Sequence, residues 1–154
     1  MSYDLIALAQ RAKAAERMLA LASSAQKNQA LLAAADALER AANDILAENE
    51  KDLSAGRENS LSDALLDRLA LNRARITAMA DGMRSVAVLP DPIGLVLEEF
   101  DRPNGLHLTK RTVPIGVIAV IYEARPNVTA DSAALCLKSG NTVILRGGKE
   151  AIRS

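Results

Sequence analysis

The chain has 154 residues, of which 49% are hydrophobic and 25% charged, and its formal net charge is +0. This length suits one domain with a hydrophobic core and is short for a two-domain enzyme. The neutral charge argues against a nucleic-acid binder, and no apolar run is long enough to span a membrane. The single cysteine, Cys136, cannot form an internal disulfide, so we expect a cytoplasmic protein.

Helical spacing dominates the first 90 residues, because apolar side chains recur there at steps of three and four. Ser23 with Gln26 predicts a capping box, and Ser62 and Asn72 are candidate N-caps of two later helices. A polar stretch over residues 48–59 is expected to end the second helix in a loop containing Gly56. The predicted apolar stripes are Leu5, Leu8, Ala12, Ala15 and Leu19; Leu31, Ala35, Leu38, Ala42 and Ile45; Leu65, Leu66 and Leu69; and Ile76, Met79, Met83 and Val86.

Prolines at 90 and 92 end the helical region, and the pattern then changes to a period of two. Asn104-Gly105 lies between two short apolar segments, which predicts an antiparallel hairpin whose second strand runs to Thr112. Such a hairpin is too small to be stable alone, so we expect it to pack on the rest of the protein or on a partner subunit. His107 lies in it without a second ligand, which favours a structural or surface histidine over a metal site.

Residues 117–121 form a continuous apolar run, as expected for a parallel strand covered on both faces. A helix opened by Asn127 or Thr129 and ended by Gly140 separates it from a second such strand at residues 142–145. Strand, helix and strand make a βαβ unit, which predicts an α/β fold and the start of a doubly wound parallel sheet. Two strands cannot complete such a sheet, so the sequence predicts the front portion of a larger protein.

Polar residues follow both predicted strands, at residues 122–127 and 146–150. In open α/β sheets, ligands bind beyond the carboxyl ends of the strands, and a helix N-terminus there suits an anion. Gly148-Lys149 resembles the end of a phosphate-binding P-loop, but Val143 replaces its first glycine and Glu150 its metal-binding hydroxyl. The common dinucleotide fingerprint is missing as well. Cys136 falls on the apolar side of its helix, which favours an inert buried thiol.

Several blocks of the sequence resemble the gamma-glutamyl phosphate reductase family, a branch of the aldehyde dehydrogenase superfamily. They are RTVPIGVI from Arg111, IYEARPNVT from Ile121 and LKSGNTVILRGGKE from Leu137, together with LLDRLAL from Leu65 and DPIG from Asp91. The resemblance covers the whole chain and implies an aldehyde-dehydrogenase-like α/β fold, of which this is the N-terminal portion only. It divides the chain into helices of the cofactor-binding domain (1–92), the β-hairpin of an oligomerisation arm (93–113), and the truncated first βαβ unit of an NADP-binding domain (114–154).

The resemblance implies NADPH-dependent reduction of L-glutamyl 5-phosphate to L-glutamate 5-semialdehyde and phosphate, in proline biosynthesis. In that chemistry a cysteine thiolate displaces phosphate, and hydride from the cofactor then releases the aldehyde. The family's cysteine lies downstream in a separate catalytic domain. It is not Cys136, so this segment alone lacks the nucleophile. The family also implies a homo-oligomer built through the hairpin at 95–112, with glutamate 5-kinase as the pathway neighbour and no metal.

The resemblance assigns Arg146, Gly147, Gly148 and Lys149 to the cofactor. Lys149 stands where the superfamily places an acidic residue that binds the ribose hydroxyls. A lysine there would attract a 2′-phosphate, which agrees with a preference for NADP(H).

The first loop corresponds to the superfamily segment whose asparagine amide donates to the oxyanion. Asn127 is the candidate donor, because it lies at a helix start. Arg125 is a candidate contact for the doubly anionic acyl phosphate. Glu123 could also bind substrate, or it could pair with Arg125 and only order the loop.

Two alternatives stay open at this point. The chain could belong to a different acyl or aldehyde dehydrogenase, which its substrate would distinguish. It could also be a non-catalytic truncated fragment that binds nucleotide, which the mass of the native chain would distinguish.

Overall fold

The structure, a computed structural model, describes residues 4–154. Six α-helices lie in that range: α1 Leu5–Leu19, α2 Ser24–Arg40, α3 Ala42–Glu58, α4 Asp63–Leu69, α5 Arg73–Val88 and α6 Pro126–Lys138. The strands and the 3-10 turn are β1 Val96–Asp101, β2 His107–Arg111, β3 Val117–Ile121, β4 Thr142–Arg146 and η1 Lys149–Ala151.

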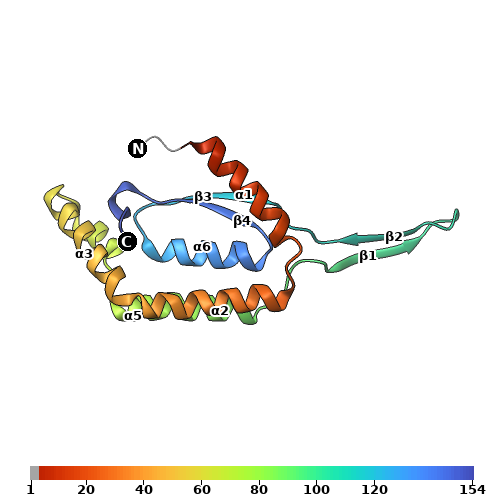
Figure 1. The fold of residues 1–154 in the computed structure, drawn as a ribbon, viewed down its shortest axis with the longest axis horizontal. Helices are drawn as coiled ribbons and strands as arrows, with labels where there is room; N and C mark the ends of the chain where they lie inside the picture. Colours follow the sequence, from red (N-terminus) through yellow and green to blue (C-terminus); the bar gives the residue numbers. More distant parts are fainter. Residues whose placement is uncertain (1–3) are drawn as a thin grey trace.

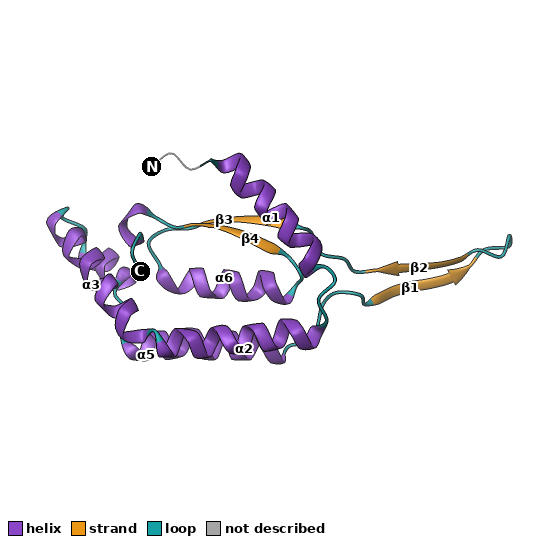
Figure 2. Cartoon of the chain, in the orientation of Figure 1, coloured by secondary structure: helices purple, strands orange, loops and turns teal. Residues whose placement is uncertain are grey.

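The helices and strands form layers (Figure 1). Strands β3 and β4 make a parallel pair, with α1 against one face and α6 against the other. Helices α2 and α5 pack on each other and on α6, so they form a further layer beneath it (Figure 2). The α/β class that the sequence predicts is therefore confirmed.

The hydrophobic core lies between α2, α5 and α6, where the apolar stripes of three helices meet. Arg84 of α5 reaches across to α2, with its Nη2 atom 2.8 Å from Asp36 Oδ1 and 2.6 Å from Glu39 Oε2. Helix α1 differs, because none of its residues is buried. The buried members of the cluster are Leu31, Ala35, Met79, Ala80, Met83, Ala87, Ala130 and Ala134.

The predicted helix caps are confirmed at two of three positions. Ser23 and Gln26 form the reciprocal capping box, and the Asn72 side chain accepts a hydrogen bond from the backbone N–H of Arg75 at 2.8 Å. Ser62 occupies the N-cap of α4, but its side chain makes no capping hydrogen bond. The backbone carbonyl of Ser62 accepts from Leu65 and Leu66 instead, so this helix starts without a side-chain cap.

The predicted boundary between the second helix and a polar loop is wrong. Helix α2 ends before Ala41, and residues 42–58 form a separate helix, α3, with Gly56 inside it. Two polar residues of this stretch face the interior of the protein, which a loop would leave in solvent. Asn49 is 1% exposed and Asp52 2% exposed, and both are hydrogen-bonded. Polar side chains that face inward interrupt the three- and four-residue apolar spacing of this helix. The sequence pattern over residues 48–59 is therefore similar to that of a loop.

The βαβ unit forms as expected, with one shift. Helix α6 begins at Pro126, not at Asn127 or Thr129, and Arg125 is its N-cap residue. Proline suits the first helical position, where its missing N–H would have had no helical partner. Gly140 follows the helix with a φ of +69°, which the predicted glycine stop requires. In the parallel pair, Ile121 lies opposite Arg146, so both strands end at the same edge.

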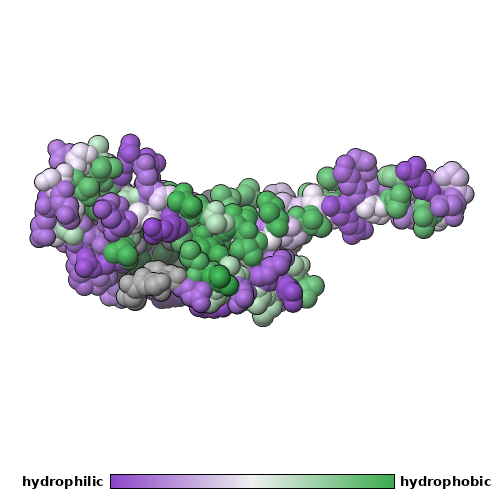
Figure 3. Space-filling model, turned by 90° about the horizontal axis from the view of Figure 1, so that it is seen from above, coloured by the Kyte–Doolittle hydropathy of each residue, from purple (hydrophilic) through white to green (hydrophobic). Residues whose placement is uncertain are grey.

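The β1–β2 hairpin also forms, and it stands away from the body of the molecule (Figure 1). Its turn contains Gly105 with a φ of +84°, and β2 ends at Arg111. Backbone hydrogen bonds of 3.0 Å still join Thr112 to Gly94 and Leu95, so the pairing reaches the predicted end. Phe100 pairs with Leu108 on one face, whereas Glu99 and Asp101 lie on the other. In the space-filling view, the hairpin joins a body whose hydrophobic residues gather over the layer of α1 and the sheet (Figure 3).

Candidate functional site

The loops that follow β3 and β4 lie against each other. The backbone N–H of Tyr122 donates to the carbonyl of Arg146 at 3.0 Å, which continues the sheet by one bond. A Cβ atom added at Gly148 would lie 3.1 Å from the backbone nitrogen of Ala124, and one at Gly147 would lie 3.4 Å from the Tyr122 ring. The two predicted ligand loops are therefore packed together, and the glycines permit this close approach.

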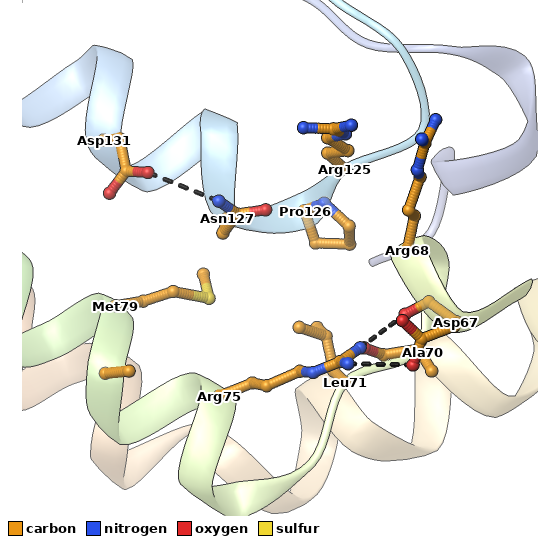
Figure 4. Close-up of a pocket in the computed structure, with 11 residues that line it drawn as sticks. Asp67, Arg68, Ala70, Leu71, Arg75, Met79, Arg125, Pro126, Asn127 and Asp131 are labelled. Atoms are coloured by element: carbon orange, nitrogen blue, oxygen red, sulfur yellow. Dashed lines mark hydrogen bonds and ion pairs between the residues drawn. The ribbon is translucent and has the colours of Figure 1, made fainter. Parts of the chain in front are cut away.

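A cleft of about 470 Å³ opens beside the first loop, between the α4–α5 corner and the start of α6 (Figure 4). A volume of this order accommodates a small ligand. Arg125 and Asn127, both predicted site residues, line it. The polar lining consists of Asp67, Arg68, Arg75, Arg125, Asn127 and Asp131.

The side chains of Arg125 and Asn127 differ in whether other groups of the protein already bind them. Within residues 4–154, no hydrogen bond or ion pair engages the Arg125 guanidinium. The Asn127 amide donates to Asp131 Oδ2 over a long 3.4 Å, so one of its two N–H groups is only weakly held. The arrangement therefore offers an unneutralised cation and an amide donor at a helix N-terminus, which together suit an oxyanion.

Of the two alternatives left open for Glu123, the pairing with the Arg125 side chain does not form. Glu123 Oε2 lies 3.7 Å from Nη1 of Arg68 on α4, and the Arg125 backbone N–H, not its side chain, donates to the Glu123 carbonyl. The side chains of this ion pair are 74% and 48% exposed, respectively. Since an exposed pair of this length contributes little to stability, it leaves both groups open to exchange with a ligand.

Arg68 is a site residue that the sequence did not single out. It lies in the LLDRLAL block that carries part of the family resemblance, but nothing local distinguishes it from a solvated helix residue. Arg75 lines the same cleft and is fully engaged, donating to the carbonyl of Ala70 at 2.6 Å and to Asp67 Oδ1 at 2.9 Å. Arg75 therefore fixes the α4–α5 corner, whereas Arg68 faces the loop.

The predicted cofactor residues lie at the end of β4. Arg146 is the last residue of the strand, Gly147 and Gly148 form the link, and Lys149 opens η1 with its side chain exposed. The segment that follows is anchored on α3. There the buried Asp52 carboxylate accepts the backbone N–H groups of residues 153 and 154 at 3.0 Å. The exposed cations are thus carried on a backbone that is fixed at both ends.

Cys136 lies on the buried side of α6, and burial raises the pKa of its thiol above the ordinary value. A thiol that ionises less readily is a poor nucleophile. Among residues 4–154, no group of three or more His, Cys, Asp or Glu side chains is arranged to hold a metal ion. In the same range, no helix combines the length and apolarity needed to cross a membrane.

Comparison with known proteins identifies the relatives of this chain. It is 59% identical over 150 residues to gamma-glutamyl phosphate reductase of Rhodospirillum rubrum, which covers 97% of this chain and 35% of that protein. It is 55% identical over 144 residues to the enzyme of the same name from Brucella anthropi, covering 94% of this chain and 34% of that protein. No family model matches the chain.

Solved structures similar to this chain carry the same enzyme name. The crystal structure of gamma-glutamyl phosphate reductase from Thermotoga maritima matches with a TM-score of 0.95 at 40% identity, over 98% of this chain and 36% of that one. The Saccharomyces cerevisiae enzyme matches with a TM-score of 0.91 at 37% identity, over 99% of this chain and 39% of that one.

The resemblance to the gamma-glutamyl phosphate reductase family is confirmed. It extends over nearly the whole chain, in sequence and in fold. The chain spans about a third of the length of the curated relatives that it matches.

Proposed function

We propose that the intact protein is a gamma-glutamyl phosphate reductase that converts L-glutamyl 5-phosphate to L-glutamate 5-semialdehyde and phosphate, in proline biosynthesis. The observation that carries the proposal is the 59% identity to the Rhodospirillum rubrum enzyme over 97% of this chain. The cleft supports it independently, because it presents a cation and an amide donor beside a helix N-terminus. An acyl phosphate substrate needs both kinds of group.

In this proposal the residues of the first loop act on the acyl group. Arg125 binds the phosphate, and Asn127 donates its amide N–H to the oxyanion that forms when the acyl carbon is attacked. For this the Asn127 amide exchanges its long bond to Asp131 for the substrate oxygen, a change that costs little because the bond is 3.4 Å. The attacking cysteine belongs to a part of the protein outside these 154 residues.

The second loop holds the cofactor in this proposal, and NADP(H) is the cofactor. NADPH supplies the hydride when bound. The Lys149 ammonium attracts the 2′-phosphate that distinguishes NADP from NAD, and Arg146 lies beside it at the end of β4. Gly147 and Gly148 keep the backbone between them close to the neighbouring loop.

The cofactor assignment is tested by Lys149→Glu. Reversing the charge is expected to raise the KM for NADPH by about 10-fold or more, because a carboxylate repels the 2′-phosphate, and to change the KM for NADH much less. Steady-state kinetics of the full-length protein with both cofactors measure this. Lys51→Glu, on the exposed surface of α3, is the matched control and should change neither KM. Equal losses for NADPH and NADH would exclude the 2′-phosphate role.

The reaction itself is tested with the native protein in the reverse direction. Semialdehyde oxidation that depends on phosphate and NADP⁺ is the expected result. Oxidation of unrelated aldehydes without phosphate would favour another acyl or aldehyde dehydrogenase. A native chain with a mass of about 16 kDa and no turnover would favour a non-catalytic nucleotide-binding fragment.

We further propose that the intact enzyme is a cytoplasmic homo-oligomer joined through the β1–β2 hairpin. The hairpin stands clear of the body and has an apolar pair, Phe100 and Leu108, on one face. An isolated two-stranded hairpin is marginally stable in water, so a partner subunit accounts for its order. Glutamate 5-kinase, which makes an acyl phosphate of this kind, is the proposed pathway neighbour.

A further inference from the structure

We propose that Arg68 of α4 works with Arg125 to clasp the phosphoryl group of the substrate, and that Glu123 occupies Arg68 until the substrate arrives. This inference rests on the proposed function for the source of the phosphate. It adds a substrate-binding residue from a helix distant in sequence from both predicted loops. Both residues line the same cleft, and Figure 4 shows the guanidinium groups of Arg68, from α4, and Arg125, from the start of α6, pointing to the same side.

The charges of the cleft leave two guanidinium groups for a ligand. Of its three arginines, Arg75 is engaged by Asp67 and by the carbonyl of Ala70. Arg125 has no side-chain partner within residues 4–154, and Arg68 has only the 3.7 Å ion pair with Glu123. Two guanidinium forks match the two negative charges of a phosphoryl group, and each can donate two parallel hydrogen bonds to its oxygens.

The two carboxylates that line the cleft, Asp67 and Asp131, each already have a partner. The Asp67 carboxylate is paired with Arg75 at 2.9 Å, and the Asp131 carboxylate accepts the Asn127 amide on the next turn of α6. The backbone N–H groups at the start of α6 add positive potential, since the 13-residue helix directs its N-terminus at the cleft.

Glu123 gives this site an internal competitor. Its carboxylate already lies at the Arg68 fork, so the fork is reachable by an oxyanion that enters from the β3 loop. The pair is exposed and long, and a doubly charged phosphoryl group with better geometry displaces it. Removing the Glu123 charge should therefore strengthen phosphate binding, whereas removing the Arg68 charge should weaken it.

The test uses inorganic phosphate as the probe and the full-length protein. Equilibrium dialysis with radiolabelled phosphate is expected to show binding that Arg68→Met weakens about 10-fold or more. Arg68→Lys should keep part of the affinity, because it retains the charge and loses the fork. Glu123→Gln should tighten binding several-fold. The matched control is Arg57→Met, which removes an exposed arginine paired with Glu50 on α3 and should leave phosphate affinity unchanged.

Opposite signs for the Arg68 and Glu123 variants separate this role from a structural one. If the pair merely ordered the loop, both substitutions would weaken phosphate binding, and that result overturns the inference. Wild-type affinity in Arg68→Met, or no phosphate binding by the wild type, overturns it as well. If Arg68→Met does not fold, Arg68→Lys and Glu123→Gln test the inference. Arg68→Lys should weaken phosphate binding, and Glu123→Gln should strengthen it.

A kinetic measurement distinguishes failure of this inference from failure of the proposed function. In the reverse direction, the aldehyde is oxidised by NADP⁺, phosphate becomes the acyl phosphate, and a proton is released. Arg68→Met should raise the KM for phosphate and leave the KM for NADP⁺ unchanged. A wild type that does not oxidise the semialdehyde would refute the function, while dialysis would still report on the Arg68–Arg125 site.

Discussion

Gly148 lies where the loop after β4 crosses the loop after β3. Its φ of −63° is open to any residue, so backbone conformation does not require glycine there. Space favours glycine, because an added Cβ would lie 2.7 Å from Glu150 Oε2, at the end of a flexible side chain, and 3.1 Å from the backbone nitrogen of Ala124. An added methyl group would have to move the proposed cofactor loop and substrate loop apart by a few tenths of an ångström.

Gly148→Ala is therefore expected to lower the free energy of unfolding by about 1–3 kcal/mol, the usual cost of forcing extra atoms into a packed contact. It should also raise the KM for the nicotinamide cofactor, since the loop that carries Lys149 must shift. Urea denaturation and steady-state kinetics measure the two effects in the full-length protein.

Gly82→Ala is the control for that substitution. Gly82 lies inside α5, where the nearest atom to an added Cβ is Asp131 Oδ1 at 3.7 Å, an ordinary contact. Alanine in a helix interior is expected to stabilise by about 0.5–1 kcal/mol relative to glycine. The explanation by close approach fails if both alanine variants change stability in the same direction.

At the residue scale, the sequence predicts the cleft only in part. Arg125 and Asn127 could be selected because polar groups directly after a buried strand lie at the ligand edge of such a sheet. Arg68 could not, because its proximity to Glu123 depends on how α4 packs beside the β3 loop. That contact is a property of tertiary structure and has no local pattern.

At the scale of elements, the predictions succeed where one physical signal dominates. The capping box at Ser23, the Asn104-Gly105 turn and the parallel pairing of the two apolar strands are confirmed, because capping, turn chemistry and strand hydrophobicity act locally. The burial predicted for these strands is not found in these 154 residues, where each residue of β3 and β4 is half-buried or exposed. Helix α3 was missed because the buried Asn49 and Asp52 make its inner face polar. Their partners lie at Leu69 and Leu71 and at the segment after β4, far along the chain.

The β1–β2 hairpin carries a titratable network on its polar face. His107 Nδ1 lies 2.8 Å from Asp101 Oδ1, and Nε2 lies 3.0 Å from Glu99 Oε1. Hydrogen bonds to Asp101 first, and then to Glu99, raise the pKa of His107 above its ordinary value of 6.5. The charged imidazolium, which donates from both nitrogens, is therefore favoured in the folded hairpin.

The sign of the pH effect follows from this raised pKa. The contribution of His107 to hairpin order is fully present below the ordinary histidine pKa and is lost as pH rises through the raised folded value. NMR titration of the His107 ring in the full-length protein should give a pKa above 6.5. Asp101→Asn should lower that pKa. An unchanged His107 pKa in this variant would show that the ion pair does not persist in solution.

At the scale of the whole molecule, the β1–β2 hairpin lies outside the hydrophobic core and has no buried apolar residues of its own. The core lies between α2, α5 and α6, whereas Phe100 is 41% and Leu108 38% exposed on the hairpin. The sequence could predict that such a hairpin needs a partner. It could not predict how far the hairpin stands from the body, because that depends on the path of the chain between packed elements (Figure 1).

Leu108→Glu is expected to lower the oligomeric state of the full-length protein, because it places a charge beside Phe100 on the face proposed to meet a partner subunit. Size-exclusion chromatography with light scattering measures the mass. Thr109→Glu puts the same charge on the opposite, polar face and should leave the mass unchanged. A wild-type mass for Leu108→Glu would rule out this face of the hairpin as the interface.

The position of α1 on the sheet has a consequence for synthesis of the chain. The Thr142 hydroxyl donates to the carbonyl of Ala12 at 3.1 Å, across 130 residues, and α1 packs chiefly on β4. A ribosome adds roughly 5–20 residues per second, so α1 emerges on the order of ten seconds before the strand that receives it. Helices α2 and α5 can pair in that interval. The first helix made is thus among the last to dock, and its Ala12 and Leu19, which are half-buried in the folded chain, stay uncovered until β4 arrives.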